Sequence, residues 1–292
     1  MRFTAWLVLL ATLLLWSGNW IVARAVRHDV APGIATAGRL VIVLAILAPF
    51  VFSELISKLK NLKGDDWRIL AALGFTGGGL HLALQWLGLH YTTATSAVLY
   101  LSTTPIFILL MAPFFGESIS ARRWLGMLIS FCGVATIAAQ GDLARLASLS
   151  FNRGDVMALV SMMMWAGYTV LLRLRRDPLS TLELIVMVCL FGLVFMAPWV
   201  AVELVRGTAL HLTPAGAAAV AYSAIGSLLL AYAGWSYVVT RLGASRAGVT
   251  MHLMPGLGIL LSAVFLGEYP HWFHFAGIGL ILAGVALSTW RR

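Results

Sequence analysis

The sequence predicts an all-α integral membrane protein whose ten transmembrane helices form two inverted five-helix repeats. Three observations predict this fold: the composition, the spacing of the apolar stretches, and an internal repeat. Of the 292 residues, 61% are hydrophobic and only 11% are charged, which is too little polar surface to cover a soluble globule. We therefore expect the lipid bilayer to surround most of the chain.

Ten apolar stretches have the length that a membrane crossing requires, because a hydrocarbon core about 30 Å thick needs about 20 apolar residues of helix. Their approximate limits are Thr4 to Ala25, Ala31 to Ser53, Trp67 to Leu89, Ala94 to Gly116, Arg122 to Gln140, Gly154 to Leu172, Leu179 to Glu203, Pro214 to Val239, Ser245 to Leu266 and Trp272 to Trp290. The connectors are too short for a further folded domain, so we expect the function to lie within the bilayer.

The basic residues alternate between connectors on the two sides of the predicted bundle. Fourteen of the 20 lysines and arginines fall on one side and five on the other, with Arg39 alone inside a span. Basic connectors face the cytoplasm, so both termini are expected there, in a bacterial inner (cytoplasmic) membrane. The formal charge of +9 then reflects membrane topology, and no nucleic-acid partner is expected.

The second half of the chain repeats the first at an offset of 149 to 151 residues. The matching positions are Leu15-Trp16-Ser17-Gly18 with Met164-Trp165-Ala166-Gly167, Ala48-Pro49 with Ala197-Pro198, Gly77 with Gly226, Trp86 with Trp235, Ala94 with Ala244, Pro105 with Pro255, Gly116-Glu117 with Gly267-Glu268, and Gly133-Val134-Ala135 with Gly284-Val285-Ala286. Because each half holds an odd number of spans, the second copy enters the membrane from the opposite face. The predicted parts are residues 1–141 (spans 1 to 5), a connector at 142–153, and residues 154–292 (spans 6 to 10). Inverted repeats are typical of secondary transporters, whose site lies near the midplane between the halves.

Deep tryptophans mark the first and sixth spans. Trp16, Asn19 and Trp20 share one helix face by their spacing, and the sixth span offers Trp165 and Tyr168. Trp16 and Trp165 lie too far from the span ends to belong to an interfacial belt. They either pack helices together or wall a cavity in which a flat apolar group with a polar end can stack.

The remaining candidate substrate-binding residues are polar side chains inside spans: His81, Gln85, Tyr100, Ser102, Ser227 and His252. The alternative for the histidines is a simple hydrogen bond between helices. We also expect paired hinges at Pro105 and Pro255, because a proline inside a helix frees the carbonyl four residues back, here Leu101 and Met251. Glycines at 77, 78 and 79 (Gly77, Gly78, Gly79) allow close backbone approach and complete the predicted hinge set.

Charged groups are scarce inside the spans. Every aspartate and glutamate falls near a span end or in a connector, although a charge at the bilayer centre costs at least about 2.5–3.5 kcal/mol and is kept there for function. This pattern argues against carboxylate-driven antiport and favours facilitated diffusion, with a histidine-carried proton as the alternative. Arg39 could snorkel outward, pair with polar groups between helices, or attract a substrate carboxylate.

No metal, cofactor or catalytic site is predicted. Cys132 and Cys189 each lie inside an apolar span, where they form neither a disulfide framework nor a metal cluster. His271 and His274 lack an acidic partner and the third ligand that zinc requires. We find no nucleophile with an adjacent base and no paired midplane acids, so an enzyme is not expected.

Two pairs of glycines recur seven residues apart, Gly126 with Gly133 and Gly277 with Gly284. Small residues on one helix face favour tight helix contact, either within the bundle or between two copies. The oligomeric state is left open by this pattern, and a monomer is compatible with it.

The ordered, duplicated pieces carry a family resemblance: the tryptophan and glycine motif that opens each half, Arg39, the Ala-Ser-Arg-Ala stretch at Ala244 to Ala247, each mid-span proline and each Gly-Glu pair. The whole chain resembles a ten-span member of the drug/metabolite transporter superfamily with two EamA-type domains. The resemblance implies metabolite export. The length and tryptophan content are similar to those of bacterial aromatic amino-acid exporters of the YddG type.

The function predicted from these features is export of amino acids or related small amphipathic metabolites by alternating access, as a facilitative uniporter. The alternatives are a proton-coupled drug/metabolite antiporter and, beyond it, a channel or membrane scaffold. Nucleotide-sugar transport is disfavoured because several buried lysines or arginines are needed for the phosphates. Positions at which the two halves differ, such as His81 against Leu230, are expected to set substrate choice.

Overall fold

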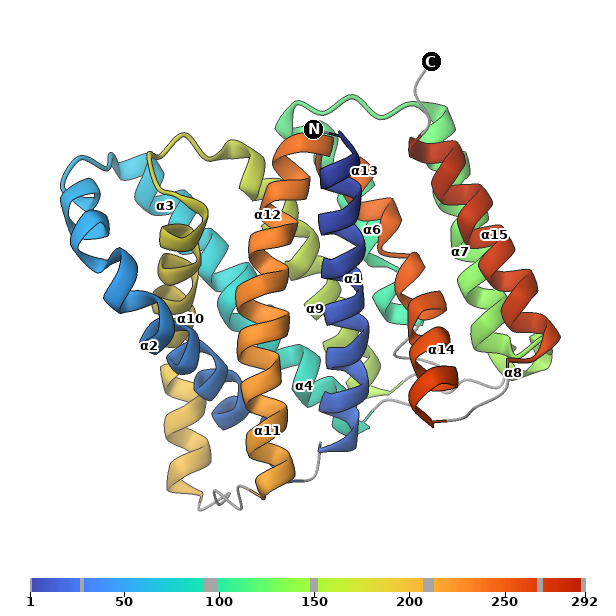
Figure 1. The fold of residues 1–292 in the computed structure, drawn as a ribbon, viewed down its shortest axis with the longest axis horizontal. Coiled ribbons are helices and arrows are strands. Elements are labelled where there is room, and N and C mark those ends of the chain that lie inside the picture. The colour runs from blue at the N-terminus through green and yellow to red at the C-terminus, as the bar shows by residue number, and fades with distance from the viewer. Residues whose placement is uncertain are drawn as a thin grey trace.

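The computed structural model is a helical bundle that describes residues 2–26, 29–91, 99–147, 152–206, 213–266 and 270–289, and no strand occurs in these ranges. Helix α1 (Arg2–Ala25) begins, and helix α15 (Trp272–Thr289) ends, on the same face of the bundle, at the top of Figure 1. We call this the N-terminal face. Gly267 and Glu268, which the internal repeat pairs with Gly116 and Glu117, lie outside the described residues, as does Ala94.

Between these two helices the chain alternates long and interrupted helical stretches (Figure 1). In order they are α2 (Pro32–Leu59), α3 (Gly64–Leu73), η1 (Gly74–Leu80), α4 (His81–Tyr91), α6 (Thr104–Met111), η2 (Ala112–Phe115), α7 (Ala121–Ala139), α8 (Leu143–Ala147), α9 (Arg153–Leu171), η3 (Leu172–Leu174), α10 (Thr181–Val205), α11 (Pro214–Tyr222), η4 (Ser223–Leu230), α12 (Ala231–Leu242), α13 (Ala244–Thr250) and α14 (Leu253–Leu266).

Seven helical stretches within the described ranges are long and apolar enough to cross a membrane: Phe3–Ala23, Pro32–Leu59, Gly64–Gly88, Arg153–Leu174, Thr181–Val205, Pro214–Leu242 and Trp272–Thr289. A shorter apolar stretch spans Leu99–Phe115. Of the other two predicted spans, one coincides with α7, whose first turn carries two arginines, and the other is divided between α13 and α14. A multi-pass helical membrane protein is confirmed, while the ten-span count and the cytoplasmic termini stay predictions.

Local sequence explains where two of these helices begin. The Asn152 side chain accepts hydrogen bonds from the backbone N–H groups of Gly154 and Asp155, and the Asp155 carboxylate accepts from the N–H of Asn152. Ser180 and Glu183 form the same reciprocal arrangement at the start of α10. Such capping boxes satisfy N–H groups that the first helical turn leaves without partners.

Each half contains one π-helical segment, η1 in the first and η4 in the second, at positions that the internal repeat aligns. A π-helical turn is rare and occurs mostly at functional sites. Around η1 the glycines permit direct helix contact, since a β-carbon on Gly77 would lie 2.8 Å from Tyr168 Cε2. The hinge role of Gly77, Gly78 and Gly79 stays a prediction, whereas their close approach to neighbouring helices is confirmed.

The proline-containing stretches are broken rather than bent. Ser102 and Thr103 form a turn before α6, and a turn likewise separates α13 from α14. Pro105 and Pro255 therefore lie in the first turn of a helix, where the missing N–H costs no hydrogen bond, and not inside a continuous helix as expected. Their role as paired hinges stays a prediction. The freed carbonyl expected at Met251 is wrong, because it accepts from the N–H of Met254 (3.0 Å).

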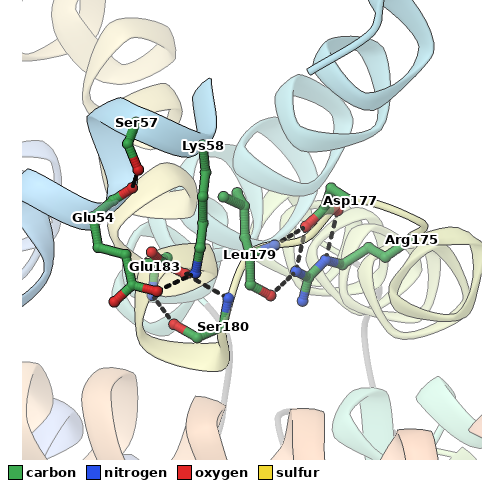
Figure 2. A network of polar contacts seen from close by, with 8 residues as sticks. All are labelled: Glu54, Ser57, Lys58, Arg175, Asp177, Leu179, Ser180 and Glu183. Carbon is green, nitrogen blue, oxygen red and sulfur yellow. Dashed lines mark hydrogen bonds and ion pairs between the residues drawn. The ribbon is translucent and has the colours of Figure 1, made fainter. Parts of the chain in front are cut away.

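Helices α2 and α10 are tied together at both ends. On the N-terminal face, Lys58 Nζ lies 2.9 Å from Glu183 Oε2 and 2.7 Å from Glu54 Oε1, as Figure 2 shows. At the other end of the pair, the Glu203 carboxylate accepts from the N–H groups of Gly33 (3.0 Å) and Ile34 (2.9 Å). A negative charge is favourable at this first turn of α2 because the N–H groups there are unpaired within the helix.

The linker before α10 is ordered by a second ionic contact (Figure 2). Arg175 donates to both Asp177 carboxylate oxygens and to the Leu179 carbonyl (2.8 Å). Burial by itself would raise the pKa of Asp177, but the hydrogen bonds and charge of Arg175, with the N–H of Leu179, hold that pKa below its ordinary value. The linker that leads into α10 is thus held in one conformation at neutral pH.

Helices α7 and α15 cross at paired glycines. A β-carbon on Gly126 would lie 2.5 Å from the Gly284 carbonyl oxygen, and one on Gly133 would lie 2.5 Å from the Gly277 carbonyl oxygen. Backbones this close exclude any side chain at the crossing points. The predicted tight contact is confirmed, and it lies within the chain.

Substitution of Gly277 with alanine tests this contact, with Gly279 on the same helix as the matched control. A β-carbon on Gly277 would lie 2.7 Å from the Gly133 carbonyl oxygen, whereas nothing lies within 4 Å of one on Gly279. Gly277→Ala should lower the melting temperature of the detergent-solubilised protein by roughly 3–10 °C, as overpacking does. Gly279→Ala should leave it unchanged or raise it slightly, since alanine favours helix. Equal melting temperatures for the two variants would contradict the contact.

Candidate functional site

A pocket lies between the two halves of the chain. Its walls are formed by Trp16, Asn19, Trp20, His81, Leu82, Gln85 and Leu101 from the first half and by Met162, Trp165, Ser227, Tyr232, Met251 and Met254 from the second. The cavity volume is about 30 Å³. In this conformation the pocket has room for a few waters, and a larger solute requires the walls to move apart.

Five aromatic side chains from both halves form an aromatic cluster at one side of the pocket: Trp16, Trp165, Tyr168, Tyr232 and Trp235. Trp165 is its centre, with ring centroids 5.1 Å from Trp16, 4.9 Å from Tyr168, 5.1 Å from Tyr232 and 6.0 Å from Trp235. The Trp16 and Trp165 rings meet edge to face and the Tyr168 ring stacks on Trp165, both favourable arrangements for aromatic pairs. The cluster gives the pocket a rigid apolar wall.

Hydrogen bonds from polar atoms of the aromatic cluster join the two halves of the chain. Trp16 Nε1 donates to the Ser227 carbonyl in η4 (3.1 Å), and the Tyr232 hydroxyl donates to the Gly77 carbonyl in η1 (2.7 Å). Each bond runs from one half to the π-helical segment of the other. Trp165 Nε1 is buried and finds no hydrogen-bond partner among the described residues. An unpaired buried donor is costly, so this indole N–H is a site of strain in the cluster.

Neutral polar groups line the rest of the wall. His81 Nδ1 lies 3.0 Å from the Ser161 carbonyl oxygen and 2.9 Å from its hydroxyl, which leaves Nε2 for a solute. The Asn19 side-chain oxygen accepts from the Ser223 hydroxyl (2.5 Å), and its amide nitrogen is a donor at the pocket. The wall therefore combines an aromatic surface with hydrogen-bonding groups that carry no acidic charge.

The structure brings together seven of the eleven predicted binding residues: Trp16, Asn19, Trp20, His81, Gln85, Trp165 and Ser227. The other four do not line this pocket. Tyr168 stacks behind Trp165, and Tyr100 hydrogen-bonds with Asp155. His252 Nε2 lies 2.9 Å from the Ser102 carbonyl oxygen, and its Nδ1 lies 2.5 Å from the Ser130 hydroxyl. Any direct part of these four in substrate binding stays a prediction.

Six wall residues were not among the predicted binding residues: Leu82, Leu101, Met162, Tyr232, Met251 and Met254. Met162 and Tyr232 each lie three residues before a tryptophan of the cluster, so helical spacing could have placed them on the same face. Leucine and methionine are common throughout the chain, and their type gives no signal of a pocket.

The EamA-like transporter family matches residues 3–139 and, a second time, residues 152–290. The chain belongs to the EamA-like transporter family. Among relatives of this EamA-like chain is a protein of Archaeoglobus fulgidus named as an uncharacterized transporter, 30% identical over 290 residues that cover 97% of this chain and 96% of the relative. Another is the uncharacterized transporter YetK of Bacillus subtilis, 25% identical over 99% of this chain and 87% of the relative.

One relative carries a more specific name. A protein of Streptantibioticus cattleyicolor named as a probable terminal-alkyne amino-acid exporter is 26% identical over 235 residues, 80% of this chain and 76% of its own. A crystal structure at 22% identity superposes with a TM-score of 0.77 and covers 99% of this chain and 97% of the other. The latter likeness shows that the EamA-like chain shares the fold of that solved structure.

In this EamA-like transporter the pocket takes side chains from both of the family-matched segments. Pockets with an apolar lining and a few convergent polar groups are typical small-molecule sites. The family acts on small molecules within a membrane, and this pocket is lined by residues of both segments.

Replacement of Trp165 distinguishes a binding wall from simple packing. Trp235 is the matched control, because it is equally buried and belongs to the same cluster but does not line the pocket. Trp165→Ala and Trp235→Ala should lower the folded yield to a similar extent. Transport per folded molecule should fall about tenfold or more only in Trp165→Ala, since the solute loses a stacking surface. Equal transport per folded molecule in the two variants would leave Trp165 a packing residue.

Proposed function

We propose that this EamA-like transporter exports amino acids or related small amphipathic metabolites by alternating access, as a uniporter. The observation that carries the proposal is the wall of the pocket, which joins an aromatic surface centred on Trp165 to the neutral polar groups of Asn19 and His81. A solute with a flat apolar part and a polar end can stack on the first and hydrogen-bond to the second. The name of the Streptantibioticus cattleyicolor relative supports amino acids as the class.

Uniport is supported by the chemistry of the wall. No aspartate or glutamate is among the residues that line the pocket in the described part of the chain, so the wall offers no carboxylate to carry a coupling proton or cation. The second candidate function, proton-coupled antiport, rests on one observation. His81 lines the pocket, and an imidazole can carry a proton near neutral pH.

Alternating access is supported by the distribution of ties between helices. The α2–α10 pair is held at both ends and the α7–α15 pair at its glycine crossings, so each pair moves as one body. The helical segments that line the pocket include α1, α4, α9, η4, α12 and α14, and their separation changes access. We place the two repeats at 1–141 and 154–292, in ten spans of a bacterial inner membrane with both termini in the cytoplasm.

Polar contacts join the two halves on the N-terminal face in this conformation. Glu117 is paired with Arg123 (3.3 Å) and with Arg173, and it accepts from the Ser245 hydroxyl. Glu117 and Arg123 belong to the first half, and Arg173 and Ser245 to the second. Opening of this face separates the halves here and therefore breaks the Glu117 contacts to Arg173 and Ser245.

Counterflow in proteoliposomes tests the proposal. A panel of radiolabelled amino acids, nucleosides and cationic drugs is offered with and without an imposed pH gradient. At least one aromatic or apolar amino acid should exchange, and the gradient should not drive its accumulation. Absence of exchange for every amino acid would contradict the substrate class.

His81→Gln separates the two mechanisms on the same vesicles. In a uniporter this variant should lower exchange equally with and without the gradient, because glutamine replaces the imidazole of the wall with an amide of different shape that does not titrate. In a proton-coupled antiporter the wild type would accumulate solute when the gradient is imposed, and His81→Gln would abolish that accumulation while exchange persisted. The latter pattern would overturn uniport.

A further inference from the structure

Arg39 is a fully buried arginine in the first third of α2. One of its terminal nitrogens donates to the Thr36 hydroxyl (3.2 Å) and to the Leu82 carbonyl (3.5 Å), and the guanidinium lies over the Trp86 ring, 5.0 Å from its centroid. These partners are all electrically neutral. Among the described residues Arg39 forms no ion pair, and its Nε finds no hydrogen-bond partner.

The guanidinium lies directly behind the pocket wall. Leu82, whose carbonyl accepts from Arg39, lines the pocket beside His81. The positive potential of Arg39 therefore reaches the interior of the pocket, and in a medium of low dielectric constant it falls off slowly with distance.

The internal repeat provides a comparison that speaks against a purely structural role. Arg39 aligns with Val188 of α10, and its stacking partner Trp86 aligns with Trp235 of α12. The second half thus packs the equivalent pair of helices, α10 with α12, with a valine at that position. The architecture does not need the charge, and burying it in one half without an ion-pair partner among the described residues is costly.

We propose that Arg39 makes the pocket select solutes that carry a carboxylate. This inference rests on the proposed function and narrows its substrate class: the preferred solute is an amino acid or similar acid, whose carboxylate lies in the field of Arg39 while its apolar part stacks on the aromatic cluster. No lysine or arginine lines the pocket in the described residues. A single cation behind the wall suits a monoanionic carboxylate better than a phosphate ester, which needs several donors.

The test compares a solute with its amide, which has the same shape and lacks the negative charge. Counterflow of phenylalanine is inhibited by unlabelled phenylalanine or phenylalaninamide in the wild type, Arg39→Gln and Arg39→Lys. In the wild type the amide should be about tenfold weaker, as expected for one charge pair at an effective dielectric constant of about 20. Arg39→Gln should bring the ratio close to one, and Arg39→Lys should keep it.

A purely structural arginine would give a different pattern. If Arg39→Gln lowers transport but keeps the wild-type ratio of the two inhibitors, the proposal is overturned. If Arg39→Gln does not fold, the thermal stabilisation of wild-type protein by the two ligands is measured instead. Equal stabilisation by phenylalanine and its amide overturns the proposal, and stabilisation by phenylalanine alone supports it.

Failure of the proposed function is recognised separately. If the wild type neither exchanges nor binds any amino acid, the proposed substrate class is wrong. The carboxylate preference is then tested by the thermal stabilisation that indole-3-acetate and indole-3-acetamide give. A larger shift with the acetate in the wild type and in Arg39→Lys, with equal shifts in Arg39→Gln, would support the proposal. Equal shifts in the wild type would overturn the proposal for acids in general.

Discussion

Two aromatic side chains, Trp16 and Tyr232, each donate a hydrogen bond to a carbonyl oxygen in the π-helical segment of the other half. A bilayer offers no water to a backbone group that leaves the regular helical pattern, so such a group must find its partner inside the protein. The irregular turns η1 and η4 can exist at membrane depth because indole and phenol donors reach them. The same two rings form the wall of the pocket, so the hydrogen bonds that permit the irregular backbone also hold the site in shape.

The fold class could be predicted because its signal is spread over the whole chain. The length of the apolar stretches, the alternation of basic connectors and the duplicated motifs each extend over tens of residues. An exception at one position therefore does not change the predicted fold class. Trp16 and Trp165 could be predicted as site residues because tryptophan is unusual at that depth in a span. His81 and Asn19 followed as polar groups on or near the same faces.

The local backbone geometry could not be predicted from the sequence, and neither could the part of the site that depends on it. A π-helical turn inserts an extra residue and has no fixed sequence pattern. The glycines of Gly74–Leu80 indicate close helix contact but not a π-helical turn, and Ser223–Leu230 reads as ordinary helix. The breaks before Pro105 and Pro255 bring Ser102 and His252 into contact with each other instead of turning both to the pocket. Those two residues occupy aligned positions of the repeat, and their pairing is a contact that only a three-dimensional arrangement of the halves could reveal.

The tie between α2 and α10 constrains sequence differently at its two ends. Lys58 and Glu183 are joined through side chains, so exchanging the acid and the base between the two positions can preserve the attraction. Glu203 instead accepts from backbone N–H groups, whose charge and polarity a side-chain substitution does not change. A β-carbon on Gly33 would lie 2.7 Å from Glu203 Oε2, so a side chain there displaces the carboxylate, while Ile34 needs only to keep its backbone N–H. One end of the helix pair can thus drift in evolution by compensated exchange, and the other can change only by losing the tie.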